Sequence, residues 1–240
     1  MPVTKVLWQG LDAGIKRKKR KMSEMQVQYI THSGSDLLVV NAARVSFAKE
    51  SKQFNGKDQK LITYLAEHKH WLPFRHPQVT LRCKAPMFVA RQVGKHQTGF
   101  SWSEESRRYI DTPPEFYWPD KWRKRAEDKK QGSTDQDVTH KAFGNFCDLP
   151  VYSEEIALIA LDLYTDMLRH DYAPEQARMV LPQNMMVNWV WTGSLLGWAQ
   201  MCKARLADDA QRETQEFARK VQDVVAPLYP VSWDNLTRYL

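Results

Sequence analysis

The spacing of apolar residues predicts a mixture of strands and helices in the first half of the chain. Residues 26 to 31 are rich in β-branched and aromatic side chains, which favours a strand. Residues 59 to 70 place apolar side chains three and four positions apart, which predicts an amphipathic helix. The run QVTLRCKA, at 78 to 85, alternates as a strand does, and Pro86 suits the first position of the helix expected to follow.

The second half shows helical patterns after one long polar stretch. From Thr112 to Pro150 the chain loses its periodicity, so we expect an inserted loop at about 120–150. Ser153 can cap a helix whose first turn carries two glutamates. The apolar stripe of that helix comprises Ile156, Ile159, Leu163 and Met167.

Three further helices are expected towards the C-terminus. Pro174 marks the start of the first, and the second is expected around residues 189 to 205. Asp208 or Asp209 is the predicted cap of the third, which is amphipathic. The tryptophans of the middle segment are expected in the core or at an interface rather than as a platform for stacking bases.

The composition fits one globular domain. The chain has 240 residues, of which 42% are hydrophobic, enough to bury a substantial core. It has no apolar run long enough to cross a bilayer and no secretory signal, so we expect a cytoplasmic protein without a membrane partner. Cys83, Cys147 and Cys202 lack metal-binding spacing, so we expect reduced thiols and no metal site.

The net charge of +7 is concentrated near the N-terminus. The run KRKKRK, from Lys16 to Lys21, contributes six positive charges, which leaves the rest of the chain close to neutral. Such a run can contact nucleic acid or an anionic surface, but a solvated extension is the commoner outcome. We therefore do not expect nucleic acid as a partner.

The stretch from Lys84 to Tyr109 has the highest density of groups suited to a charged ligand. Gln92, Lys95 and His96 lie three and four residues apart, so we expect them on one face of a helix. A second group, with a carboxylate, hydroxyls and two guanidiniums, comprises Ser103, Glu104, Ser106, Arg107 and Arg108. Such a group can hold a phosphate and a polar ring, although a run of this composition is more often a solvated surface.

Within this stretch, ARQxxKHQ followed by SWSEESRRY resembles the signature of flavin-dependent thymidylate synthases. Four other blocks agree with that family in the same order, so the resemblance covers most of residues 25 to 225. The blocks are AARVSF at 42–47, HWLPFRH at 70–76, EQARMVLP at 175–182, and the segment from Trp191 to Gln211. The resemblance implies a mixed α/β single domain with a helical part at 25–240, preceded by a basic N-terminal extension at 1–24.

The resemblance also implies the reaction, which is the conversion of dUMP to dTMP. The family takes the carbon from methylenetetrahydrofolate and the reducing equivalents from NADPH through FAD, and it needs no cysteine nucleophile. Arg205 and His70 are the implied catalytic residues, because the first matches the arginine that polarises uracil and the second lies near the flavin ring. The implied dUMP-binding residues are Gln92, Glu104, Ser106, Arg107, Arg108, Arg178 and Arg205.

The flavin side of the implied site departs from the family pattern more than the nucleotide side does. The implied FAD-binding residues are Ser46, His70, Lys95, His96, Gln97, Glu104, Ser194 and Gln200. Lysine and glutamine stand at 95 and 97 in place of arginines, and a lysine meets a phosphate as a point charge without the arginine fork. In this family FAD is shared between subunits, so the resemblance also implies a homotetramer.

Two alternatives stay open. The first is a basic nucleic-acid-binding protein that uses KRKKRK and the tryptophans. It predicts salt-dependent DNA binding that is lost when residues 1–22 are removed. The second is a family member that binds flavin or nucleotide without turnover, which the substitutions at 95, 97 and 103 suggest.

Overall fold

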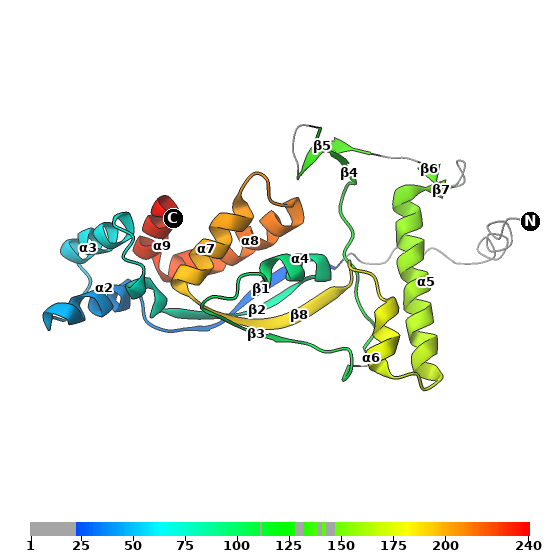
Figure 1. Cartoon of the computed structure of the whole chain (residues 1–240), viewed down its shortest axis with the longest axis horizontal. Helices are drawn as coiled ribbons and strands as arrows, with labels where there is room; N and C mark the ends of the chain where they lie inside the picture. Colours follow the sequence, from blue (N-terminus) through cyan, green and yellow to red (C-terminus); the bar gives the residue numbers. More distant parts are fainter. Residues whose placement is uncertain (1–22, 111, 128–131, 139–140, 143–146) are drawn as a thin grey trace, which may run out of the picture.

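The centre of the molecule is a four-stranded antiparallel sheet with the strand order β1-β2-β8-β3 (Figure 1). The computed structural model describes residues 23–110, 112–127, 132–138, 141–142 and 147–240, so the basic run at 16–21 lies outside the described residues. The strands are β1 (Gln26–His32), β2 (Gln78–Pro86), β8 (Met186–Ser194) and β3 (Phe100–Glu104).

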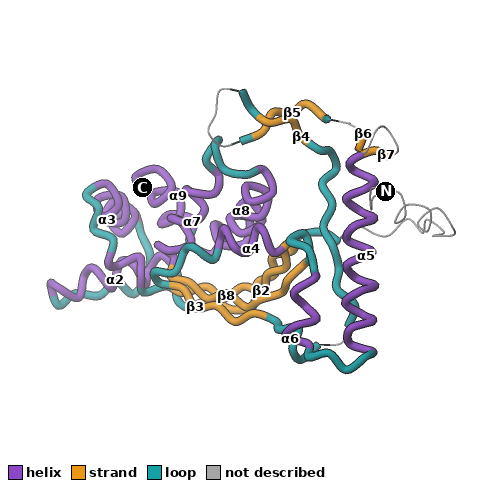
Figure 2. The backbone as a smooth tube through the Cα atoms, turned by 45° about the vertical axis from the view of Figure 1, so that its right-hand side comes forward, coloured by secondary structure: helices purple, strands orange, loops and turns teal. Residues whose placement is uncertain are grey.

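Helices cover one face of this sheet, as the views in Figures 1 and 2 both show. They are α4 (Met87–Val93), α7 (Leu195–Leu206), α8 (Arg212–Val225) and α9 (Pro230–Tyr239), with the 3-10 turn η4 (Ala226–Leu228). Alternate residues of β2 point into the core, because successive side chains of a strand face opposite ways. The buried ones are Val79, Leu81, Cys83 and Ala85. The strands predicted at 26–31 and 78–85 are confirmed.

A second helical group lies at one end of the sheet, beside α9 (Figure 1). It consists of α2 (Asp36–Arg44), η1 (Val45–Phe47), α3 (Gly56–Glu67) and η2 (Leu72–Arg75). Ser35 caps α2, and Asn55 and Asp58 form a capping box that starts α3. The helix predicted at 59–70 is therefore confirmed, although it begins at Gly56 and ends at Glu67.

The opposite end of the molecule carries the long helix α5 (Figure 1). Its elements are β4 (Arg123–Arg125), β5 (Ser133–Asp137), β6 (Lys141–Ala142), β7 (Cys147–Asp148), α5 (Leu149–Arg169), α6 (Pro174–Ala177) and η3 (Arg178–Val180). The loop expected at about 120–150 contains an antiparallel β4–β5 pair, which the polar composition hid. Pro174 starts α6 as predicted.

The helix predicted around residues 189 to 205 is wrong in its first part. Residues up to Ser194 form β8, and α7 begins at Leu195. Trp189 and Trp191 are both buried because a strand returns every second residue to the same face. Trp198 is buried as well, so the prediction that these tryptophans belong to the core is confirmed.

Three predicted helix starts also differ from the structure. Pro86 is the last residue of β2, and α4 begins after it. Ser153 lies inside α5, which begins at Leu149. Gln211 stands at the N-cap of α8, so neither of the aspartates before it caps the helix. The mixed α/β fold with a helical part is as predicted, and in the described ranges no helix is long and apolar enough to cross a membrane.

Candidate active site

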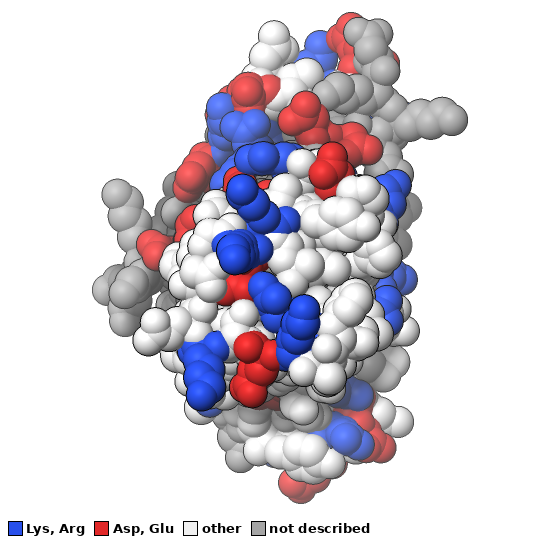
Figure 3. All heavy atoms as spheres, turned by 90° about the vertical axis from the view of Figure 1, so that its left-hand side faces the viewer, with Lys and Arg blue, Asp and Glu red and all other residues white. Residues whose placement is uncertain are grey.

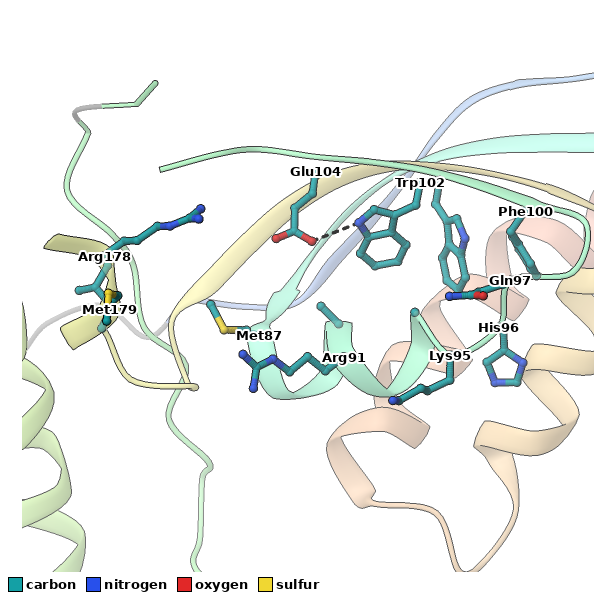
Figure 4. Close-up of a pocket in the computed structure, with 14 residues that line it drawn as sticks. Met87, Arg91, Lys95, His96, Gln97, Phe100, Trp102, Glu104, Arg178 and Met179 are labelled. Carbon is teal, nitrogen blue, oxygen red and sulfur yellow. Dashed lines mark hydrogen bonds between the residues drawn. The ribbon is translucent and has the colours of Figure 1, made fainter. Parts of the chain in front are cut away.

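A cavity of about 940 Å³ lies between α4, β3 and η3 (Figure 4). Its polar and charged lining residues are Arg91, Lys95, His96, Gln97, Glu104 and Arg178. Its larger apolar lining residues are Met87, Phe100, Trp102, Met179, Leu181 and Trp191. Aromatic walls together with several cations and one carboxylate suit a heteroaromatic ligand that carries phosphate.

The turn after α4 presents three of the predicted flavin-binding residues to this cavity. The helix ends at Val93, so Lys95, His96 and Gln97 follow the turn instead of continuing the helix. The predicted common helical face is therefore wrong. Arg91 lines the cavity in the place where Gln92 was expected. Arg91 and Lys95 are four positions apart, but Lys95 lies beyond the end of α4, so helical spacing does not identify Arg91.

The strand β3 forms the opposite wall. Its alternation places Trp102 and Glu104 on the same face, and Trp102 Nε1 donates a hydrogen bond to the Glu104 carboxylate at 3.1 Å. Trp102 also stacks on Trp189 with ring centroids 4.4 Å apart. These contacts hold the carboxylate of Glu104 in a fixed orientation. Trp102 was not predicted, because SWSE was not recognised as a strand.

A glycine is required where the chain turns into β3. Gly99 has a φ of +78°, in the left-handed region that favours glycine. A Cβ atom at this position would lie 2.8 Å from Ser194 Oγ. Ser194 Oγ is itself occupied, because it accepts a hydrogen bond from Gly197 N at the start of α7.

Arg205 lies directly behind the cavity wall. Its Nε donates to His96 Nε2 at 3.1 Å, and its Nη2 donates to the backbone oxygen of Gln92 at 2.8 Å. Because Nε2 accepts, the imidazole of His96 is neutral and carries its proton on Nδ1. Burial is the main reason that the pKa of His96 lies below its ordinary value, and the nearby positive charge of Arg205 lowers it further.

The side chain of Gln92 faces α8 instead of the cavity. Its Nε2 donates to Gln211 Oε1 at 2.5 Å, and its Oε1 accepts from Thr214 Oγ1 at 3.1 Å. The structure therefore does not place Gln92 among the cavity-lining residues predicted to contact dUMP. The Gln92 side chain instead joins α4 to the N-terminal end of α8 through these two hydrogen bonds.

The predicted phosphate-binding residues are split between the cavity and the loop that follows β3. Arg178 extends from η3 toward the cavity (Figure 4). Ser106, Arg107 and Arg108 lie on the loop. Arg107 donates to the backbone oxygen of Thr112, and the guanidinium carbon of Arg108 lies 5.0 Å from the centroid of the neighbouring tyrosine ring. In this conformation the loop residues do not line the cavity.

The remaining predicted flavin-binding residues occupy two other pockets. Ser194 and Gln200 line a pocket of about 310 Å³ that shares Phe100 with the main cavity. Ser46 and His70 line a pocket of about 610 Å³ between α2, α3 and η2. Within one chain the structure thus brings Lys95, His96, Gln97 and Glu104 together but leaves the other four apart.

Neither of the cysteines whose side chains are described offers a reactive thiolate. Cys83 and Cys202 are fully buried, and burial raises the pKa of both thiols. Neither lines the cavity. Among the described residues there is also no group of three histidines, cysteines or carboxylates arranged to hold a metal ion.

The chain is similar to proteins named flavin-dependent thymidylate synthase and to a UMP/dUMP methylase of known structure. It is 34% identical to the flavin-dependent thymidylate synthase of Thermus thermophilus, with 89% of this chain and 76% of the relative covered. It is also 34% identical to the enzyme of the same name from Thermosipho africanus, with 86% and 88% covered. A crystal structure of the UMP/dUMP methylase PolB from Streptomyces cacaoi, bound with 5-Br dUMP, superposes with a TM-score of 0.76 at 29% identity. That alignment covers 91% of this chain and 97% of PolB.

The family model described as "Thymidylate synthase complementing protein" (Thy1) matches residues 28–231, which include every segment that builds the cavity. This protein therefore belongs to the Thy1 family.

Proposed function

We propose that this protein is a flavin-dependent thymidylate synthase that methylates dUMP at C5 to give dTMP. The observation that carries the proposal is the cavity in which Glu104, Arg178 and the 95–97 turn meet the aromatic wall of β3. The names of its relatives, and the bound 5-Br dUMP of PolB, support the same substrate.

The cavity supplies the groups that a pyrimidine nucleotide needs. Arg178 has the planar fork that binds phosphate oxygens in pairs. Arg107 and Arg108 lie on the loop after β3, outside the cavity lining, and would add positive charge for the phosphate only with a movement of that loop. Glu104, held by Trp102, is positioned to accept hydrogen bonds from the nucleotide.

Arg205, which lies behind the cavity wall beside His96, is the proposed activating group for uracil. A guanidinium beside the pyrimidine edge favours negative charge on the ring, and an electron-rich C5 attacks an electrophilic carbon. Two hydrogen bonds, to His96 and to the backbone of Gln92, fix the plane of this guanidinium in advance. With the described thiols buried and protonated, the activation proposed here needs no cysteine nucleophile.

The described residues fit a flavin. The aromatic walls of the cavity suit an isoalloxazine ring, and Lys95, His96 and Gln97 would hold the cofactor from the turn after α4. FAD supplies the reducing equivalents when bound. We propose that these come from NADPH and that methylenetetrahydrofolate supplies the carbon, as in the family.

The pocket of Ser46 and His70 would hold another part of the flavin. Figure 3 shows this end of the molecule, where a row of Lys and Arg side chains runs down the surface with Asp and Glu side chains among them. Lys49 lines the pocket itself, and so does Arg44, whose charge is already paired with Asp58. Positive charge around the pocket suits the pyrophosphate of FAD.

We propose a homotetramer in which these separate pockets are joined across subunits. Exposed apolar side chains support assembly, since contiguous apolar surface marks interaction sites. Exposed large apolar side chains on the described part of α5 include Ile156, Ile159 and Leu163, and those near the Ser46–His70 pocket include Val45, Phe47 and Leu72. Leu163→Glu should lower the molecular mass measured by light scattering and reduce flavin content. An unchanged tetramer would count against α5 as the interface.

The function is tested with dUMP that carries deuterium at C5. In the presence of methylenetetrahydrofolate, NADPH and FAD, we expect deuterium to be released to solvent as dTMP forms. UMP is the second substrate to test, because PolB is named for both nucleotides. A yellow protein that retains the deuterium and oxidises no NADPH in response to dUMP would instead be a non-catalytic binder of flavin.

A further inference from the structure

The β4–β5 hairpin is joined to the start of α8 by an ion pair that is largely shielded from solvent. Arg123 Nη2 lies 2.8 Å and 3.0 Å from the two carboxylate oxygens of Glu213. Their side chains are only 15% and 7% exposed. Arg123 Nε also donates to Ser133 Oγ on the other strand of the hairpin at 2.7 Å. The guanidinium is therefore held from both sides in one orientation.

The carboxylate of Glu213 extends this contact toward the cavity. Its Oε2 accepts a hydrogen bond from Gln211 Nε2 at 2.9 Å. Gln211 Oε1 in turn accepts from Gln92 Nε2, and Thr214 Oγ1 donates to Gln92 Oε1. Both ends of the Gln92 amide are thus fixed by residues at the N-terminus of α8.

Gln92 is also the backbone anchor of Arg205. The Gln92 carbonyl and the His96 ring each accept a hydrogen bond from the same guanidinium. A movement of the last turn of α4 relative to α8 would therefore change the direction in which Arg205 points. The contact chain from Arg123 to Arg205 contains only hydrogen bonds and one ion pair, and it links the hairpin to the cavity wall.

A second ion pair connects the same hairpin to the same helix without taking part in this chain. Arg212 Nη1 lies 3.0 Å from Asp135 Oδ1, and the two side chains are 55% and 68% exposed. Exposed pairs of this kind contribute little to stability. Asp135 is therefore a matched control for Arg123.

We propose that Arg123 is a positioning residue for the uracil end of the active site, acting through Glu213, Gln211 and Gln92 on the orientation of Arg205. The inference rests on the proposed role of Arg205 in activating uracil. Removing the arginine leaves a shielded carboxylate without its main partner. Glu213 then turns toward solvent or other donors, and the hydrogen bonds that Gln211 and Thr214 make to the Gln92 amide weaken.

The first test measures dUMP affinity by calorimetry on the full-length, flavin-loaded protein. Arg123→Gln should weaken binding about tenfold. Asp135→Asn should change it less than about twofold. In an Arg205→Ala background the effect of Arg123→Gln should shrink to less than about twofold, because its effect passes through Arg205. Unchanged affinity in Arg123→Gln, or an equal loss in both backgrounds, would overturn the proposal.

The second test needs no nucleotide. Nuclear magnetic resonance of the His96 ring gives its titration in wild type and variants. Because Arg205 contributes to the low pKa of His96, Arg123→Gln should move that pKa toward the ordinary value, and Asp135→Asn should leave it unchanged. Arg123→Lys, which keeps the charge, should restore most of the wild-type titration.

The two tests separate the two hypotheses. A wild-type protein that binds no dUMP counts against the proposed function. An unaltered His96 titration in Arg123→Gln counts against the positioning role alone. Should Arg123→Gln fail to fold, Glu213→Gln takes its place, since it removes the charge and keeps the shape; an unaltered His96 titration there overturns the proposal.

Discussion

Two segments of this protein are each held by an arginine–carboxylate pair that is largely shielded from solvent. The two pairs differ in how far apart their partners lie along the chain. At the α2–α3 end, Arg44 lies 2.7 Å from Asp58, only 14 residues further along the chain. At the hairpin end, Arg123 lies 2.8 Å from Glu213, 90 residues away. The first pair closes a local loop. The second joins an insertion to the helix that supports the cavity.

Because of this difference, we expect the first pair to contribute to stability and the second pair to affect function. Asp58 is fully buried and also accepts hydrogen bonds from Ser51 Oγ and Asn55 N, so its partners all lie in the loop that it closes. Glu213 is hydrogen-bonded to Gln211, which is in turn hydrogen-bonded to Gln92 beside the cavity wall. We therefore expect changes at the first pair to act on folding and changes along the second contact chain to act on the reaction.

The largest expected effect is at the end of the second contact chain. Arg205→Ala should lower the rate of dTMP formation by about 100- to 1000-fold, because a preorganised group aimed at developing charge is lost. The measurement is the release of deuterium from C5 of dUMP under single-turnover conditions. Lys203→Ala, an exposed change in the last turn of the same helix, is the control. Equal losses in both variants would break the comparison, since the effect would then belong to the helix.

Asp58→Ala, at the first pair, should lower the stability of the protein and leave its activity toward dUMP unchanged. It leaves Arg44, Ser51 and Asn55 N without their acceptor, and we expect a loss of about 2 kcal/mol in the free energy of unfolding, reduced from a fully buried pair because Arg44 is 25% exposed. A shift of roughly 4–8 °C in Tm follows. Scanning calorimetry measures the shift, and the affinity for dUMP should be unchanged. A tenfold loss of dUMP affinity with an unaltered Tm would contradict the division.

The same carboxylate makes a pH prediction with a definite sign. Burial alone would raise the pKa of Asp58, but hydrogen bonds from Arg44, Ser51 and the Asn55 backbone outweigh it and lower the pKa. A lowered pKa contributes stability above the ordinary value of about 3.9, and this is lost as the pH falls through the folded value. The wild-type Tm should therefore fall below about pH 4 more steeply than that of Asp58→Asn.

A smaller effect is expected from the protonation of His96. Its lowered pKa keeps the ring neutral, so the hydrogen bond from Arg205 is intact at pH 7 and is lost only as the pH falls through that lowered pKa, which lies below the ordinary value of about 6.5. The affinity for dUMP should accordingly decline on the acid side of that value, several-fold at most. In His96→Gln, whose amide oxygen can still accept, this decline should disappear. A decline that persists in the variant would assign it to another group.

The smallest effect is predicted for the exposed pair. Asp135→Asn removes the contact with Arg212 and should change the free energy of unfolding by less than about 0.5 kcal/mol. Chemical denaturation measures this value. A larger loss would show that the hairpin is held mainly by its surface pair, and the contrast with Arg123 would then disappear.

Local signals in the sequence were sufficient for several elements. The alternation of β2 and the apolar spacing of α3 predicted a strand and a helix where they occur. The stripe of Phe217 and Val221 on α8 is buried, as an amphipathic helix requires. The boundary between β8 and α7 was missed because both segments are rich in apolar residues, although Gly193 and the N-cap residue Ser194 mark it.

Part of the candidate site was also predicted, because several of its residues are close together in the sequence. Lys95, His96, Gln97 and Glu104 lie in one short stretch, so local spacing together with the family resemblance identified them, and the structure gathers them in one cavity. Arg91 and Trp102 were missed, although both lie in that stretch. Arg123 was missed because a polar run gives no indication of what it will contact 90 residues later.

The sequence by itself determined the family, most of the elements, and the chemical groups available for a phosphate-bearing ring, because these depend on residue type and short-range spacing. Only the tertiary structure decided which groups meet. It turned the side chain of Gln92 toward α8, set Arg205 behind His96, and left Ser46 and His70 in a pocket of their own. These arrangements come from the packing of helices on one face of the sheet, and that packing joins residues too distant in the chain for any local pattern to record.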